Sequence, residues 1–242
     1  MRTDVVESRA VKSSKSSSVL DPAAKAVVDR LQTRANAQMG ALIRHYLPKL
    51  PQFLMGRPIG FSGDMSFYDD KLMPIEPGQG ELLYLMARAR GVRCAVEFGT
   101  SFGVSTIYLA SAVRDAGAGG RVIGTELAPG KVVAARSNIA AAGLAAYVEI
   151  MEGDARTNLR HLGEPVDILL LDGWPALAME VLQIVEPRLA DGALVIVDNI
   201  GQFPGDLRAV VEHLTQSPRY RSSILPMRGG TLVGAYAGAF LD

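Results

Sequence analysis

The sequence from residue 81 onward alternates between amphipathic segments with helical spacing and short, almost continuously apolar segments. The apolar segments are predicted to be strands of a parallel sheet, because a strand that is apolar on both faces must be covered by helices on both faces. These strands are expected at residues 94–99, 121–126, 148–154, 167–173, 193–199, 220–227 and 231–238. Gly229 and Gly230 join the last two by a turn too short for a crossover helix, so that pairing is expected to be antiparallel. The pattern predicts an α/β domain.

The composition narrows the kind of partner that such a domain can have. Of the 242 residues, 48% are hydrophobic, which is enough for one sizeable core. The 25 basic and 25 acidic side chains cancel, so we expect no binding to nucleic acid or to an anionic membrane. The single cysteine, Cys94, excludes a disulfide framework and fits a reducing cytoplasm. We expect a cytoplasmic protein, monomer or homodimer, that acts on a small molecule.

Two segments precede the regular pattern. Residues 1–20 have too few apolar side chains to offset the entropy of ordering them, which predicts a flexible N-terminal tail. Residues 21–80 are expected to form a helical extension, which Asp21 caps and Pro22 begins, and a lid loop rich in proline and glycine. In the helix, Val27, Leu31, Met39, Leu42 and Leu47 follow helical spacing, so they are expected to pack. Residues 81–242 are then the ligand-binding domain.

The segment "VEFGTSFGVS", residues 96–105, passes from an expected strand into a loop with two glycines. Ligands of open α/β sheets bind beyond the carboxyl ends of the strands, so this loop is expected to touch a ligand, and a side chain at Gly99 to fill the ligand's space. A dinucleotide fingerprint needs a glycine where this chain has Ser101, which argues against a pyrophosphate. Glu126 ends the next strand, where a carboxylate binds a ribose diol. The pattern therefore favours an adenosine without phosphates, and S-adenosylmethionine meets that description.

Five acidic residues fall where the first five strands end. They are Glu97, Glu126, Asp154, Asp172 and Asp198. Each could cap the helix that follows it, which is a purely structural role. Several carboxylates at one edge of the sheet also suit a ligand with a sulfonium and an ammonium group.

Five segments occur in order along the chain: "VEFGTSFGVSTIYLA", the acidic end of "RVIGTE", "EGDA", "ILLLDGW" and "LVIVDN". Together they resemble the class I methyltransferases and, more narrowly, the metal-dependent O-methyltransferases related to catechol and caffeoyl-CoA O-methyltransferase. The resemblance implies a Rossmann-like, seven-stranded, mostly parallel sheet with an antiparallel last strand. It also implies that a loop wraps the methionine part of S-adenosylmethionine, namely the loop of Glu97, Gly99, Ser101, Gly103 and Ser105. By the same resemblance Glu126 holds the ribose, Asp154 and Ala155 lie beside the adenine, and Asp172 belongs to both the cofactor site and the catalytic site.

Asp172, Asp198 and Asn199 end two strands that are expected to be neighbours, so their side chains should converge. Two carboxylates and an amide oxygen suit a hard cation such as Mg²⁺. In the resembling family these positions bind a divalent metal that chelates the acceptor, which implies methyl transfer to a hydroxyl of a small molecule. The alternative is that Asp198 and Asn199 form a polar turn.

The family's usual general base is missing from this sequence. Members often carry a lysine just after the first metal aspartate, but Trp174, Pro175 and Ala176 follow here. Either the metal alone lowers the acceptor's pKa, or Lys71 or His45 supplies the base, or the chain does not act on a vicinal diol. A metal-independent methyltransferase of a natural product or sugar, and a non-catalytic S-adenosylmethionine-binding protein, stay open as alternatives.

Aromatic residues offer an apolar surface for the acceptor. Trp174 directly follows the first predicted metal ligand and its glycine, where it could stack on an aromatic acceptor or simply pack. Phe61, Phe67, Tyr68 and Met73 lie in the expected lid, with core packing as the alternative.

Overall fold

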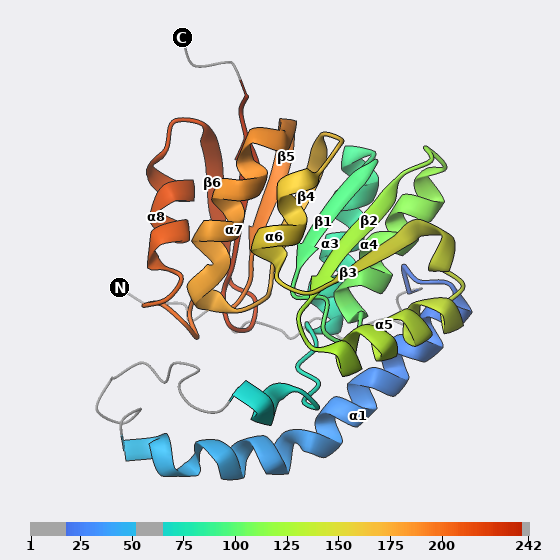
Figure 1. The fold of residues 1–242 in the computed structure, drawn as a ribbon, viewed down its shortest axis with the longest axis vertical. Helices are drawn as coiled ribbons and strands as arrows, with labels where there is room; N and C mark the ends of the chain where they lie inside the picture. The colour runs from blue at the N-terminus through green and yellow to red at the C-terminus, as the bar shows by residue number, and fades with distance from the viewer. Residues whose placement is uncertain (1–17, 52–64, 239–242) are drawn as a thin grey trace, which may run out of the picture.

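A computed structural model describes residues 18–51 and 65–238 of the chain. Its centre is a seven-stranded sheet with the strand order β3-β2-β1-β4-β5-β7-β6 (Figure 1). The strands are β1 (Cys94–Phe98), β2 (Arg121–Glu126), β3 (Val148–Glu152), β4 (Val166–Leu171), β5 (Leu189–Val197), β6 (Tyr220–Leu225) and β7 (Thr231–Tyr236). The first five pair in parallel, while β7 runs antiparallel to both β5 and β6. The predicted mostly parallel sheet with an antiparallel last strand is confirmed.

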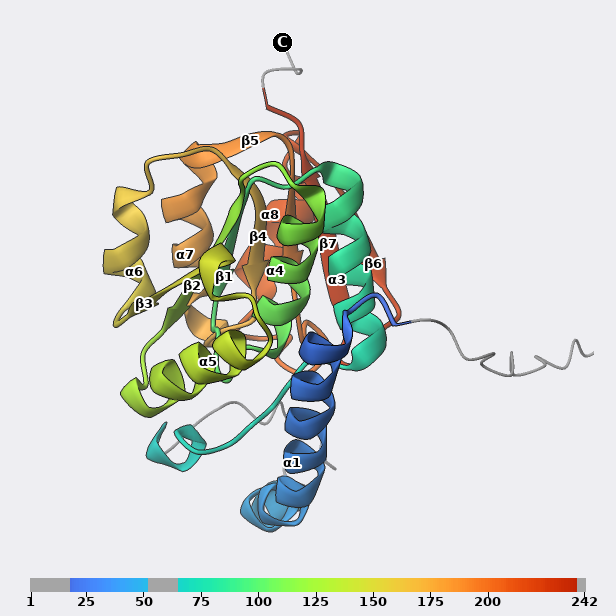
Figure 2. The ribbon, with the colours of Figure 1, turned by 90° about the vertical axis from the view of Figure 1, so that its right-hand side faces the viewer.

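Helices cover both faces of this sheet (Figure 2). One apolar core lies under α1 (Pro22–Tyr46), α3 (Pro77–Arg90), α4 (Val104–Ala116) and α5 (Pro129–Ala141). The other lies under α6 (Ala155–Asn158), α7 (Ala178–Val185) and α8 (Arg208–Gln216). Strand β1 shows the division, since Ala95 belongs to the first core and its neighbours Cys94 and Val96 to the second. Successive side chains of a strand point to opposite faces, so both faces of this strand are apolar.

Short 3₁₀ turns connect several of these elements. They are Leu47–Lys49, Met65–Tyr68, Ala145–Tyr147, Leu159–His161, Pro175–Leu177 and Glu186–Arg188. No described helix combines the length and the apolar content that crossing a bilayer requires.

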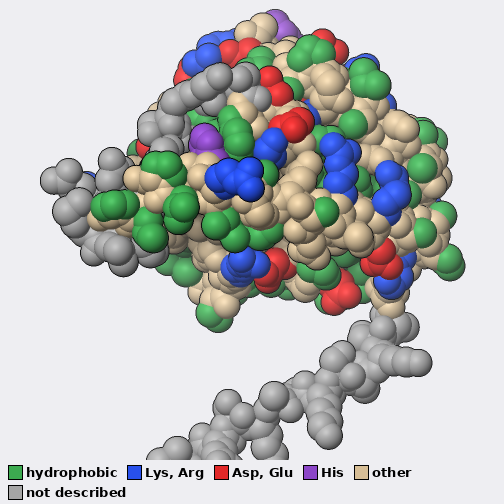
Figure 3. Space-filling view, turned by 90° about the horizontal axis from the view of Figure 1, so that it is seen from below, with side chains coloured by type: hydrophobic (Ala, Val, Ile, Leu, Met, Phe, Trp, Pro, Cys, Tyr) green, Lys and Arg blue, Asp and Glu red, His purple; other side chains and the backbone are tan. Residues whose placement is uncertain are grey.

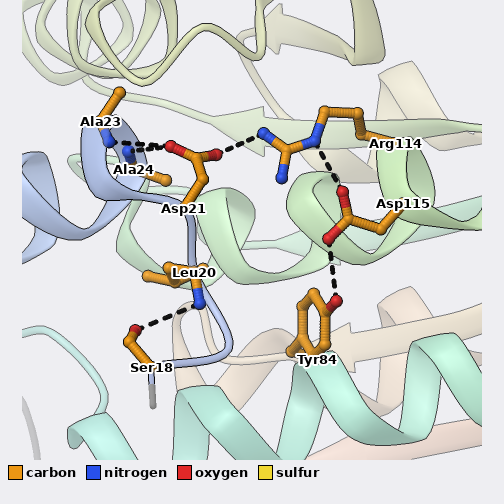
Figure 4. A network of polar contacts seen from close by, with 8 residues as sticks. All are labelled: Ser18, Leu20, Asp21, Ala23, Ala24, Tyr84, Arg114 and Asp115. Carbon is orange, nitrogen blue, oxygen red and sulfur yellow. Dashed lines mark hydrogen bonds and ion pairs between the residues drawn. The ribbon is translucent and has the colours of Figure 1, made fainter.

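The N-terminal helix α1 begins where the sequence predicts, at a cap formed by Asp21. The Asp21 side chain accepts hydrogen bonds from the backbone N–H groups of Ala23 at 2.8 Å and Ala24 at 3.0 Å. Its other oxygen pairs with Arg114 at the end of α4 (Figure 4). Arg114 also contacts Asp115, whose carboxylate accepts a hydrogen bond from Tyr84 of α3. The cap therefore ties α1 to the two helices beside it.

The outer half of α1 differs from the expected packing. Val27 and Leu31 are buried as predicted, but Met39 is 42% exposed, and Leu47, directly after the helix, is 59% exposed. The helix continues beyond α5, past the edge of the domain (Figure 1), so its outer half has less protein to pack against. Hydrophobic side chains accordingly gather at this end of α1 in the view from below (Figure 3). Residues 1–17 of the predicted tail lie outside the described residues, and Leu20 is buried in the core.

Replacing Asp21 tests the cap. Asp21→Ala is expected to lower the free energy of unfolding by about 1–2 kcal/mol, because two backbone N–H groups lose their acceptor. Asp21→Asn keeps a capping oxygen but loses the charge that faces Arg114, so it should cost less. Urea denaturation at neutral pH measures both differences.

The same cap should contribute less in acid. Burial raises the pKa of Asp21, but hydrogen bonds from Arg114, Ala24 and Ala23 together bring it below its usual value. The stabilisation is therefore fully present above the unfolded pKa of about 3.9, and it is lost as the pH falls through the lower folded value. The difference between the wild type and Asp21→Ala should shrink near pH 2. An unchanged difference would contradict a charged cap.

Candidate functional site

A cavity of about 1060 Å³ opens at the carboxyl ends of the central strands. One wall consists of the residues that follow the strands, such as Gly99 after β1, Glu126 at the end of β2 and Asp172 after β4. The opposite wall comes from α1 and from the segment that leads into α3, with residues such as Ala35 and Leu72. The cavity therefore lies where ligands bind in open α/β sheets.

Glu126 joins the two loops that line one side of this cavity. Its Oε2 accepts a hydrogen bond from the backbone N–H of Ser101 at 2.8 Å, and its Oε1 accepts one from Ala128 at 2.9 Å. Each carboxylate oxygen has a second lone pair, so both oxygens can also accept hydrogen bonds from a ligand. The structure thus places Glu126 and Ser101 together at the cavity wall.

The other residues predicted in the glycine loop are divided between the cavity and the layer beneath it. Gly99 lines the cavity, and Ser105 lines a smaller pocket that also touches Asp172. Glu97 is fully buried below the loop, where its Oε2 accepts hydrogen bonds from the hydroxyls of Thr100 and Thr106. Burial raises the pKa of Glu97 despite these bonds. The geometry of Glu97 therefore fits a role in holding the loop.

Two loop positions need glycine for backbone reasons. Gly103 caps α4 with a φ of 87°, and Gly99 has a φ of 98°. A Cβ on Gly99 would lie 2.4 Å from the Cα of Gly173 and 2.7 Å from the backbone oxygen of Asp172. The expectation that a side chain at Gly99 would fill the ligand's space is thus corrected, because the side chain would first meet the backbone of the loop after β4.

Asp154 and Ala155 also line the cavity, beyond the end of β3. Asp154 caps α6 by accepting a hydrogen bond from the backbone N–H of Arg156 at 2.8 Å, and it pairs with the Arg156 guanidinium at 2.7 Å. These contacts with Arg156 bring the pKa of Asp154 below its usual value. The helix-capping alternative therefore describes Asp154 at least in part.

Asp172, Asp198 and Asn199 converge at the cavity as predicted. The Nδ2 of Asn199 donates to Oδ1 of Asp172 at 3.3 Å and to Oδ2 of Asp198 at 3.0 Å. Asn199 has a φ of 61°, a left-handed conformation that asparagine tolerates better than most residues. This conformation turns the chain directly after β5, so that one amide can reach both carboxylates.

The two carboxylates lie in an environment that disfavours their negative charges. Burial, followed by the charges of Asp198 and Glu97, holds the pKa of Asp172 well above its usual value. Burial also raises the pKa of Asp198, although Gln79 donates a hydrogen bond to it. A cation between the two would relieve this cost, and the Asn199 amide could turn to present its oxygen. Two carboxylates and an amide oxygen fit a hard cation. Only two of these ligands are charged, and no group of three acidic, histidine or cysteine side chains among the described residues is arranged to hold a metal ion.

Neither residue suggested as a general base faces this cavity. Lys71 pairs with Asp70 and lies with its Nζ 4.7 Å from the centre of the Phe67 ring. His45 stacks on the same Phe67 ring, with the two ring centres 3.8 Å apart and the rings 12° from parallel. Both side chains lie outside the cavity lining.

Part of the expected aromatic wall is present. Tyr68, Met73 and Trp174 line the cavity, and the rings of Tyr68 and Trp174 meet edge to face at 6.3 Å. Phe67 lies outside the cavity lining, and Phe61 falls outside the described residues. An aromatic surface thus lies next to Asp172, close to the residues that could hold a cation.

Sequence patterns missed Gln79, which is buried at 4% exposure and donates to Oδ1 of Asp198 at 2.7 Å. A glutamine on the inner face of an otherwise amphipathic helix was the available signal, because buried amides need partners.

Comparison with known proteins finds similarity to methyltransferases. A family model described as a methyltransferase domain matches residues 96–200, from β1 to the turn after Asn199. A catechol O-methyltransferase from Mycobacterium tuberculosis is 37% identical over 123 residues, which are 50% of this chain and 54% of that protein. The chain is similar to the class I O-methyltransferases. The resemblance seen in the sequence is thereby confirmed.

Solved structures extend the similarity over more of this chain. An O-methyltransferase from Bacillus cereus in complex with S-adenosylhomocysteine has a TM-score of 0.63 at 26% identity, covering 67% of this chain and 82% of that one. The O-methyltransferase TomG from Streptomyces achromogenes, in complex with S-adenosylmethionine, has a TM-score of 0.64 at 26% identity, with coverages of 72% and 86%. The alignment with the Mycobacterium tuberculosis protein, by contrast, spans only about half of that relative, 54%.

Proposed function

We propose that this methyltransferase transfers the methyl group of S-adenosylmethionine to a hydroxyl group of a small molecule, assisted by a divalent cation at Asp172, Asp198 and Asn199. The observation that carries the proposal is that one cavity contains both Glu126 and this group of three. A cofactor at the first and an acceptor at the second would then be neighbours. Transfer needs little beyond such proximity, because the methyl group of a sulfonium is already a good electrophile.

The cofactor part of the proposal rests on the loops after β1 and β2. Glu126 is fixed by the backbone of Ser101 and Ala128, so its carboxylate is already oriented to accept hydrogen bonds from the two hydroxyls of a ribose. Two solved relatives were crystallised with S-adenosylhomocysteine or S-adenosylmethionine. The same ligand in this chain accounts for a ribose-type carboxylate beside a loop that lacks the glycine required for a pyrophosphate.

The acceptor part rests on Asp172, Asp198 and Asn199 and on the aromatic surface beside them. A divalent cation held by these residues would lower the pKa of a bound hydroxyl and so favour the attacking oxyanion. Trp174 and Tyr68 offer an apolar wall that suits an aromatic acceptor. The Mycobacterium tuberculosis relative is named a catechol O-methyltransferase, which makes a catechol the first acceptor to try.

Because no lysine follows Asp172, deprotonation of the acceptor hydroxyl would depend mainly on the metal. Since Lys71 and His45 do not line the cavity, the acceptor proton would leave through solvent after the cation has lowered the pKa of the hydroxyl. Methyl transfer from labelled S-adenosylmethionine to catechol, with Mg²⁺ and then with EDTA, tests this. Equal rates in both would favour a metal-independent methyltransferase, in which the Asn199 amide keeps its place between the two carboxylates.

Replacing Glu126 tests the cofactor part separately. Glu126→Gln turns one acceptor oxygen into a donor and should weaken S-adenosylhomocysteine binding by about 1.5–3 kcal/mol, since the lost hydrogen bonds involve a charged group. Glu152→Gln is the matched control, because Glu152 ends the neighbouring strand in register with Glu126 but is exposed. Isothermal titration calorimetry measures both variants. Equal affinity of Glu126→Gln and wild type would remove the ribose assignment.

A further inference from the structure

Asp198 accepts hydrogen bonds from two side chains that the sequence patterns did not identify. Gln79 Nε2 lies 2.7 Å from Oδ1 of Asp198 and 3.1 Å from Oγ1 of Thr231. The Thr231 hydroxyl donates to the same Oδ1 at 3.1 Å. Gln79, Asp198 and Thr231 are exposed by only 4%, 6% and 2%. This is a buried polar network whose three members come from α3, the end of β5 and the start of β7.

The two carboxylate oxygens of Asp198 have different hydrogen-bond partners. Oδ1 accepts hydrogen bonds from both Gln79 and Thr231, whereas Oδ2 accepts one from the amide of Asn199, which lines the cavity. If the carboxylate turned away, the Gln79 amide and the Thr231 hydroxyl would lose an acceptor, although both side chains are almost fully buried. The two donors therefore fix the side-chain orientation in which Oδ2 faces Asn199 and Asp172.

The fold brings these distant segments together through close backbone contacts. Gly80, next to Gln79, packs so tightly on α4 that a Cβ there would lie 2.2 Å from the ring of Tyr108. On the other side, Gly201 N donates to Gly229 O at 2.7 Å and Ile200 N to Gly230 O at 3.1 Å, directly before Thr231. Both donors are thus placed by backbone packing as well as by their own hydrogen bonds.

We propose that Gln79 and Thr231 are positioning residues that aim Oδ2 of Asp198 at the divalent cation. This inference rests on the proposed function, because it assumes a cation at Asp172, Asp198 and Asn199. Residues behind metal ligands commonly change metal affinity by roughly 10–100-fold when they are replaced. A purely structural network would lower stability without a specific change in metal affinity.

Four variants separate these two roles. Gln79→Met and Thr231→Val remove the donors at similar volume, whereas Thr231→Ser keeps the hydroxyl. Gln38→Met is the matched control, because Gln38 also makes hydrogen bonds between segments, to the backbone of Asp70 and Leu72, but does not contact Asp198. Isothermal titration with Mn²⁺ in the presence of S-adenosylhomocysteine gives the metal affinity, and thermal melting gives the stability.

We expect Gln79→Met to bind Mn²⁺ roughly 10–100-fold more weakly than wild type, with Thr231→Val weakened in the same direction. Thr231→Ser should restore wild-type affinity, and Gln38→Met should lower the melting temperature without changing Mn²⁺ affinity. S-adenosylhomocysteine affinity should stay within about two-fold in all four, since the cofactor's proposed contacts lie elsewhere.

The outcomes separate the inference from the proposed function. If wild type binds Mn²⁺ and Gln79→Met binds it equally well, the positioning role is wrong while the metal site stands. If Gln79→Met and Gln38→Met lose metal affinity in parallel with stability, the role of Gln79 is structural. If folded wild type binds no Mn²⁺, the metal-assisted function fails and the positioning role fails with it.

Discussion

Asp198→Ala is expected to abolish Mg²⁺-dependent methyl transfer to a catechol while leaving S-adenosylhomocysteine binding nearly unchanged. The variant removes one of the two charged ligands that we propose for the cation, and a loss of roughly 100-fold or more is expected, since replacing residues behind metal ligands already costs roughly 10–100-fold. Cofactor affinity should persist because Glu126 and the loop after β1 are intact. Initial rates with labelled S-adenosylmethionine measure the first effect, and calorimetry measures the second.

Asp191→Ala is the matched control for this variant. Asp191 lies in the same strand, β5, but is exposed, and its carboxylate accepts a hydrogen bond from Gly238 rather than facing the cavity. It should leave the response to Mg²⁺ and EDTA as in wild type. Full activity of Asp198→Ala, or of wild type in EDTA, would show that the acceptor is activated without a metal at this position.

Gly99→Val is expected to destabilise the whole domain, by more than about 3 kcal/mol. Valine strongly disfavours a φ of 98°, and its Cβ would lie 2.4 Å from the Cα of Gly173, a backbone atom that cannot move without shifting the end of β4. Urea denaturation followed by circular dichroism measures this loss. Gly130→Ala is the control, because a Cβ there would meet nothing within 4 Å.

Two results for Gly99→Val would contradict the expected loss of stability. A variant that unfolds at the wild-type urea concentration but no longer binds S-adenosylhomocysteine would show that the side chain fills the ligand's space, as the sequence alone suggested. A variant that keeps both stability and binding would contradict the steric conflict with Gly173.

Local chemistry explains why much of the fold could be predicted. Strands such as β1 and β4 are apolar on both faces, which only a sheet covered on both sides satisfies. Asp21 followed by Pro22 defines a helix start within two residues. Asp172, Asp198 and Asn199 converge because neighbouring parallel strands end at the same edge, so their sequence positions suffice.

Features that depend on distant contacts could not be predicted. Helical spacing gives the apolar side of α1 but not how far the helix extends beyond the domain, so Met39 was expected to pack and is 42% exposed. His45 was a possible base by residue type, yet its ring stacks on Phe67. Gln79 reaches Asp198 across 119 positions of sequence, a distance that no local pattern spans.

Titration of the wild-type protein with S-adenosylhomocysteine tests most directly whether the cavity at the carboxyl ends of the strands is a methyltransferase cofactor site. The geometry predicts saturable binding of one molecule per chain, weakened in Glu126→Gln, unchanged in Glu152→Gln and not competed by NAD. Folded wild-type protein that releases no heat with millimolar S-adenosylhomocysteine, or that binds NAD in its place, would contradict the proposed function.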